Sequence, residues 1–147
     1  MQTTEKNMQK YETYTQNMNR LNQALQNNSY YEAILIEYAT IEDRTNSILS
    51  DAGFEIKKKN GYYLGIAEKL KIMKNKSPFT DEICREKCSL ELIESIDCWK
   101  KERDNLIHKL MEQPVDEEKL QILAEQGKEL FRELDNSVRA LKRVIKK

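Results

Sequence analysis

Apolar residues recur every three or four positions along most of the chain, which is the period of an amphipathic helix. The clearest stripe follows Pro114, and it predicts a final helix that is capped by Asp116 and runs to about Ile145. A weaker stripe over residues 4–27 indicates a helix that covers a core rather than forming its centre. The stripe of the final helix consists of Leu120, Leu123, Gly127, Leu130, Leu134, Val138 and Leu141.

Capping and turn residues mark the remaining elements. Ser29 and Glu32 have the spacing of a capping box, so Ser29 should open a second helix, and Gly53 is suited to end it. Asn60-Gly61 predicts a turn within a loop, and Ser89 can cap another long helix. The expected helices cover residues 4–27, 29–53, 62–74, 80–88, 90–112 and 116–145.

These elements predict a single all-α domain over residues 1–147, a bundle of four long helices and one or two short ones. Four glycines and two prolines leave few positions that break helices. No apolar run is long enough to span a membrane, and the first residues lack the apolar core of a signal peptide.

The three cysteines, an odd number, favour a reducing cytoplasm over a disulfide framework. Cys84 and Cys88 lie one helical turn apart, and we interpret them as small buried apolar residues rather than half of a metal site. No metal and no cofactor is therefore expected.

The net charge is zero, but basic residues are concentrated in two segments. Residues 57–76 carry seven basic and one acidic group, and residues 139–147 carry five basic and no acidic group. Either segment could attract phosphate groups locally. The alternative is that the lysines solvate a loop and a helix end and favour the C-terminal end of the helix dipole.

Charged residues interrupt two apolar stripes. At about 100° per residue, Arg103 falls in the centre of the stripe of its helix, so it requires either a carboxylate partner or an opening in the stripe. Glu37 and Arg44 fall within the stripe of the second helix in the same way. One hypothesis places Glu37, Arg44 and Arg103 in one buried polar network, with Glu37 as partner of Arg103. The other is that long side chains reach water at the edges of the stripes.

The only histidine of the chain, His108, follows Arg103 by five residues. It lies about 140° around the helix from Arg103, on the polar flank. Asp104 precedes His108 by four residues, a spacing at which the two side chains can pair. Trp99 precedes Arg103 by four residues, so the Arg-x4-His pattern lies late in a long amphipathic helix.

This stretch, DCWKKERDNLIHKL, resembles the HEPN domain family, small helical bundles of bacterial toxin–antitoxin, defence and RNA-processing systems. EYATIEDRTNSIL and KKKNGYYLGIAEKLKIMK resemble it as well. The resemblance covers about residues 29–112, with residues 1–27 as a helical extension and residues 116–145 as a terminal helix.

The resemblance implies a cytoplasmic, metal-independent endoribonuclease of toxin or defence type, with RNA as its substrate. Arg103 and His108 are the implied catalytic residues, assisted by Asp104 and Asn105. A histidine can move a proton near neutral pH, and an arginine can stabilise charge on a phosphate. Because one histidine cannot readily act as both base and acid, the resemblance implies a homodimer with two Arg/His pairs. An antitoxin or regulatory protein is a possible further partner.

Two alternatives remain open from the sequence. The chain could be an HEPN-like helical module without catalysis that binds a protein partner or RNA. It could also be a structural helical protein in which the Arg-x4-His pattern arose by chance. The sequence contains no P-loop, GxGxxG, zinc-ligand pattern or nucleophile elbow that would indicate another enzyme class.

Overall fold

The computed structural model describes residues 2–145, and their side chains from residue 5 onward. Within this range the fold is all-helical, and no sheet is present. The prediction of an all-α bundle with four long and two short helices is confirmed. The helices are α1 (Gln2–Gln26), α2 (Tyr30–Asp51), α3 (Ile66–Asn75), α4 (Glu82–Lys87), α5 (Leu90–His108) and α6 (Glu117–Ile145).

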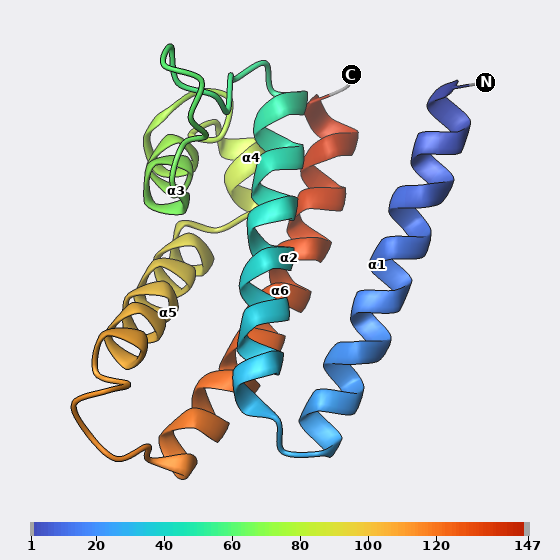
Figure 1. Ribbon diagram of the computed structural model, residues 1–147. Helices are drawn as coiled ribbons and strands as arrows, with labels where there is room; N and C mark the ends of the chain where they lie inside the picture. Colours follow the sequence, from blue (N-terminus) through green and yellow to red (C-terminus); the bar gives the residue numbers. More distant parts are fainter. Residues whose placement is uncertain (1, 146–147) are drawn as a thin grey trace.

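Helices α2 and α6 lie side by side in the same direction at the centre of the bundle (Figure 1). Helix α1 runs the opposite way on one side of them and α5 on the other, while α3 and α4 close the end near the C-terminus. The predicted stripe of α6 forms much of the core, because all of its members except the half-buried Leu130 are buried. The fold therefore rests on the α2–α6 pair.

Two of the three predicted helix caps form. The Ser89 hydroxyl accepts a hydrogen bond from the backbone N–H of Leu92, and Asp116 accepts bonds from two N–H groups at the start of α6. The capping box of Ser29 is wrong, since Ser29 makes no side-chain cap bond. The Glu32 carboxylate instead lies 3.4 Å from the Arg20 guanidinium on α1, so it is engaged across the α1–α2 turn.

The segment between α2 and α3 departs from the prediction at one end. Gly53 has φ +87° just after α2, as a helix-ending glycine does. Helix α3 begins at Ile66 rather than at Tyr62. Tyr63 forms an antiparallel bridge with Lys57, and Tyr62 accepts a backbone hydrogen bond from Lys58, across the Asn60-Gly61 turn. The backbone of residues 62 and 63 is therefore paired with the preceding segment and does not join a helix.

Helix α1 covers the core with its C-terminal part only. Leu21 and Ala24 are its buried residues, whereas Met8 and Tyr11 remain exposed. Tyr14 lies between these parts and contacts Phe131 of α6 at a ring distance of 6.3 Å. A groove of about 910 Å³ lies between α1, α2 and α6, and polar side chains form much of its lining. The expectation that α1 is a cover is confirmed.

None of the helices within residues 2–145 combines the length and the apolar character that crossing a bilayer requires. Cys84 and Cys88 are buried in the core, as expected of small apolar residues, whereas Cys98 is exposed. The part of the chain that the structure describes contains no cluster of three or more His, Cys, Asp or Glu side chains suited to a metal.

Candidate functional site

Arg103 is held on α5 by an aromatic ring of α2. Its guanidinium carbon lies 3.8 Å from the centre of the Tyr38 ring, within the range of a strong cation–π contact. Nη1 donates to Asp104 Oδ1 at 3.0 Å. Nε is buried without a hydrogen-bond partner, and the side chain is 18% exposed. Arg103 is thus well oriented, with part of its hydrogen-bonding capacity unused.

Tyr38 is a neighbour of Arg103 that the sequence alone did not indicate. It stacks on Trp99 of α5, with ring centres 6.5 Å apart, so Arg103, Tyr38 and Trp99 form one layered contact between α2 and α5. Burial raises the pKa of the Tyr38 phenol, although the Arg103 charge lowers it. The helical period places Tyr38 in the stripe of α2, but only the packing of two helices selects which α5 residue meets it.

Asp104 does not pair with His108, contrary to the prediction from their spacing. Its two carboxylate oxygens are taken by cations on the same helix: Oδ1 lies 3.0 Å from Arg103 Nη1, and Oδ2 lies 3.0 Å from Lys100 Nζ. Lys100 is also four residues from Asp104, on its N-terminal side, so the carboxylate had two candidate partners at that spacing. Asp104 therefore acts as an anchor for Arg103.

His108 is the last residue of α5 and is exposed. The predicted helix over residues 90–112 ends here, and residues 109–113 form turns that lead to Pro114. No hydrogen bond or ion pair joins Arg103 to His108 among the residues that the structure describes. Arg103 turns towards Tyr38 while His108 faces solvent, so a single chain presents the two side chains separately.

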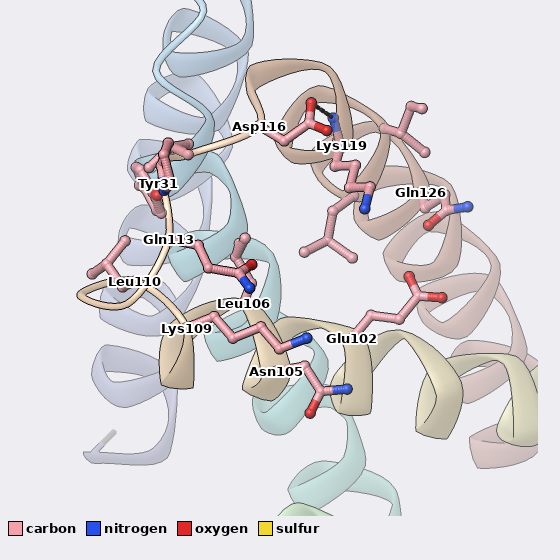
Figure 2. A pocket seen from close by; sticks show the side chains of 14 residues that line it. Tyr31, Glu102, Asn105, Leu106, Lys109, Leu110, Gln113, Asp116, Lys119 and Gln126 are labelled. Carbon is pink, nitrogen blue, oxygen red and sulfur yellow. Dashed lines mark hydrogen bonds between the residues drawn. The ribbon is translucent and has the colours of Figure 1, made fainter.

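A pocket of about 500 Å³ lies on another face of the same segment (Figure 2). Asn105 and Leu106 of α5 and Lys109, the residue that follows α5, line it, opposite the start of α6 and Tyr31 of α2. Arg103, Asp104 and His108 do not line this pocket. The structure therefore separates Asn105 from the other three predicted site residues, because the motif winds around the helix.

Glu37 is fully buried between α2, α5 and α6, and both of its carboxylate oxygens lack a hydrogen-bond partner. Gly127 makes room for it: a Cβ there would lie 2.3 Å from Glu37 Oε1 and 2.7 Å from the Trp99 ring. Burial raises the pKa of Glu37 to about 9, and the charge of Lys128 opposes this shift. The carboxyl group is therefore protonated at neutral pH.

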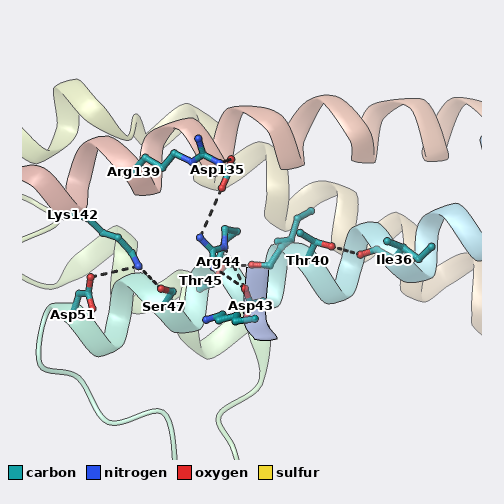
Figure 3. A network of polar contacts seen from close by, with 12 residues as sticks. Ile36, Thr40, Asp43, Arg44, Thr45, Ser47, Asp51, Asp135, Arg139 and Lys142 are labelled. Atoms are coloured by element: carbon teal, nitrogen blue, oxygen red, sulfur yellow. Dashed lines mark hydrogen bonds and ion pairs between the residues drawn. The ribbon is translucent and has the colours of Figure 1, made fainter. Parts of the chain in front are cut away.

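Arg44 belongs to a different cluster, between α2 and α6 (Figure 3). Its guanidinium lies 2.9 Å from Asp43 and 3.8 Å from Asp135, and Asp135 is also paired with Arg139 at 3.1 Å. The predicted network of Glu37, Arg44 and Arg103 does not form. Arg44 pairs with Asp43 of α2 and Asp135 of α6. Arg103 contacts Tyr38 and Asp104 instead, and Glu37 has no ionic partner among the described residues.

No protein-family model, curated protein or solved structure matches the chain.

The geometry nevertheless limits what the site can do chemically. His108 is exposed and so accessible for proton transfer, and Arg103 is a cation held by Tyr38 and Asp104 whose unpaired Nε is buried. In one chain no hydrogen bond or ion pair joins these two groups among the described residues. The apolar side chains that flank His108 are exposed, namely Ile107 at 47%, Leu110 at 42% and Met111 at 93%.

Proposed function

We propose that the chain is a metal-independent endoribonuclease of toxin or defence type, with a composite active site made by two copies. The observation that carries the proposal is the placement of the Arg-x4-His pair at the end of α5. His108 is exposed there, and Arg103 is held by Tyr38 and Asp104. The HEPN-like assignment of this helical bundle is part of the same proposal.

In the proposed reaction, His108 removes the proton from a 2′-OH of RNA, and the resulting oxygen attacks the adjacent phosphorus. Arg103 stabilises the charge that develops on the phosphate oxygens. His108 of the second copy donates a proton to the departing 5′ oxygen. The products are a 2′,3′-cyclic phosphate and a 5′-OH, and no metal takes part.

The test is an assay of the purified protein on end-labelled RNA, with and without EDTA. Cleavage should persist in EDTA and leave cyclic phosphate ends, because the nucleophile belongs to the RNA and the charge is stabilised by Arg103. Activity that disappears in EDTA and returns with a divalent metal would contradict the metal-independent mechanism. A protein that cleaves no RNA and is harmless when expressed would contradict the enzyme itself.

The second copy is expected to approach through the apolar residues beside His108. Ile107, Leu110 and Met111 are exposed at the end of α5, where removing them from water would favour association. We therefore expect a two-fold homodimer in which the two α5 helices lie close together. Light scattering at micromolar concentration should give twice the mass of the chain.

Met111→Glu should convert this dimer into a monomer without unfolding it, since Met111 is 93% exposed. The matched control is Ile83→Glu on α4, which introduces the same charge at a residue that is 59% exposed, and it should remain dimeric. Cleavage activity should be lost with the dimer. A wild-type chain that is monomeric at micromolar concentration would count against the composite site.

A non-catalytic helical module that binds a protein partner or RNA is the second candidate function. It is favoured by the contacts of Arg103, since stacking on Tyr38 and pairing with Asp104 give this residue a structural role without any substrate. The pocket beside Asn105 would then be a natural contact for an antitoxin or regulatory protein. The RNA-cleavage assay separates the two functions.

A further inference from the structure

The segment between α2 and α3 is an ordered hairpin rather than an irregular loop. The backbone of Lys58 donates to Tyr62 at 2.7 Å, and that of Leu64 donates to Ile56 at 2.8 Å. Gly61 closes the turn with φ +86°, a conformation that suits glycine. Asn60 supports it through its side chain, which accepts from the N–H of Tyr62 at 3.2 Å. These bonds hold the backbone of residues 57–63 in a defined arrangement.

This hairpin displays three lysines and two tyrosines to solvent: Lys57, Lys58, Lys59, Tyr62 and Tyr63. Tyr62 is 73% exposed and Tyr63 is 61% exposed, so neither ring contributes substantially to the core. Their large apolar surfaces therefore face water. Such rings are suited to contacts with an external planar group.

Pairing along the hairpin places a lysine next to each tyrosine. Lys57 forms the antiparallel bridge with Tyr63, and its Nζ lies 5.2 Å from the centre of that ring. Lys58 is opposite Tyr62, as their backbone hydrogen bond shows. Adjacent residues of an extended strand face opposite sides, so each side of the hairpin carries one ring and one ammonium group.

The last turns of α6 carry further basic residues near this end of the bundle. The hairpin and the last turns of α6 lie at the same end of the bundle, on different sides of the C-terminal end of α2 (Figure 1). Lys142 of α6 lies 3.6 Å from Asp51, the last residue of α2, and Arg143 is exposed next to it. Lys58 is paired with Glu68 at 3.2 Å, but Lys59 carries no ion pair among the described residues.

We propose that the hairpin of residues 57–63 binds single-stranded RNA, with Tyr62 and Tyr63 stacking on unpaired bases and the neighbouring lysines contacting phosphates. Rings that accept any base and cations that follow the backbone are the combination used by proteins that bind single strands. A duplex hides the faces of its bases, so it cannot use both tyrosines. The choice of RNA over DNA rests on the proposed function.

The hairpin and His108 lie at opposite ends of the bundle. The hairpin follows the C-terminal end of α2, whereas Tyr31, at the N-terminal end of α2, lines the same pocket as Leu106 and Lys109. At about 1.5 Å per residue, α2 separates the two regions by roughly 30 Å. The hairpin is therefore a second contact that holds a strand of several nucleotides, and it does not take part in the chemistry.

The experiment measures binding of a fluorescent oligouridine of about 12 nucleotides, a length within the usual range of single-strand sites. The full-length His108→Ala protein is used, so that binding is read without cleavage. Tyr62→Ala and Tyr63→Ala should each weaken binding about tenfold, whereas Tyr62→Phe and Tyr63→Phe should retain it because stacking needs only the ring. Tyr11→Ala, which removes a tyrosine 71% exposed on α1, is the matched control and should bind like its parent.

Replacing Lys57, Lys58 and Lys59 together by alanine should lower the salt dependence of binding. Each phosphate contact contributes about 0.7 to the slope of log affinity against log salt for a single strand, so the slope should fall by about 2. Equal affinity of the alanine variants and their parent would overturn the proposal. So would tighter binding of a duplex of the same length, or binding of phosphatidylserine vesicles without binding of the oligouridine.

These outcomes are separable from those of the proposed function. If the tyrosine variants lose binding but the wild-type protein cleaves no RNA, the RNA-binding role of the hairpin is supported and the proposed nuclease function is contradicted. If the wild-type protein cleaves RNA and the hairpin variants change neither cleavage nor binding, the nuclease function is supported and the RNA-binding role of the hairpin is contradicted.

Discussion

His108→Ala is expected to lower the rate of RNA cleavage by about 10²- to 10⁴-fold, the usual contribution of a general acid or base. Arg103→Ala should cause a loss of about 10²- to 10³-fold, as removal of a group that stabilises transition-state charge does. The double variant should be little worse than either single one, since both residues act on one transition state. Single-turnover cleavage of end-labelled RNA measures all three.

The two variants should differ in stability, which keeps loss of activity distinct from loss of folding. His108 is exposed, so its replacement should change the free energy of unfolding by less than about 0.5 kcal/mol. Arg103→Ala removes the stack on Tyr38 and should cost about 1 kcal/mol. The Arg103→Ala change should not alter the surroundings of the Glu37 carboxyl group, because the two residues are not paired.

Arg132→Ala is the control for loss of an arginine. Arg132 is exposed on α6, and among the described residues its one ion pair is with Glu129, at 3.4 Å, so its replacement should leave both activity and stability nearly unchanged. A folded His108→Ala protein that cleaves RNA as fast as wild type would contradict the proposed active site, and the helical module would become the better interpretation.

The second large effect concerns Glu37 and pH. Its pKa is about 9 in the folded protein and 4.5 in the unfolded chain, so between these values the folded state holds one proton more than the unfolded state. The contribution of Glu37 to the free energy of unfolding is therefore at its full value below about pH 4.5, and it is lost as the pH rises towards 9. The loss should be roughly 3 kcal/mol between pH 5 and pH 7, at about 1.4 kcal/mol per pH unit.

Glu37→Gln should remove this dependence, because glutamine has nearly the shape of the protonated acid and does not ionise. At pH 7 the variant should exceed wild type by roughly 3 kcal/mol, and near pH 4.5 the two should be about equal. Urea unfolding at fixed protein concentration measures both. Glu133→Gln, on the exposed face of α6, is the control and should follow the wild-type pH curve.

Gly127→Ala offers an independent check of the same site. The added methyl group would collide with the Glu37 carboxyl group and with Trp99, so it should destabilise the fold by about 1–3 kcal/mol. Shortening the acid by Glu37→Ala in the same chain should relieve part of this cost, because Oε1 is the nearest atom to the methyl position.

Parallel pH curves for the stability of wild type and of Glu37→Gln would contradict the buried, neutral carboxyl group.

The sequence by itself determined the order of the helices and the faces they bury, although not the start of α3 or the end of α5. These features depend on neighbours within about one helical turn: the apolar period, the caps at Ser89 and Asp116, and the glycines at the turns. The position of Arg103 in its stripe followed from the same period. Gly127 was also visible as the smallest member of the α6 stripe, a signal that a neighbouring helix places something bulky there.

Only the tertiary structure decided which side chains meet. The period of a helix defines its buried face but not how far one helix slides or rotates against the next. For this reason the sequence suggested Glu37 as the partner of Arg103, whereas in the packed structure Arg103 contacts Tyr38. The partner of Asp104 was decided by competition between neighbours on the same helix. Lys100, Arg103 and His108 are all close to it in sequence, and its two carboxylate oxygens pair with Lys100 and Arg103. Packing also placed the hairpin of residues 57–63 and the last turns of α6 at one end of the bundle, because α2 and α6 run side by side in the same direction.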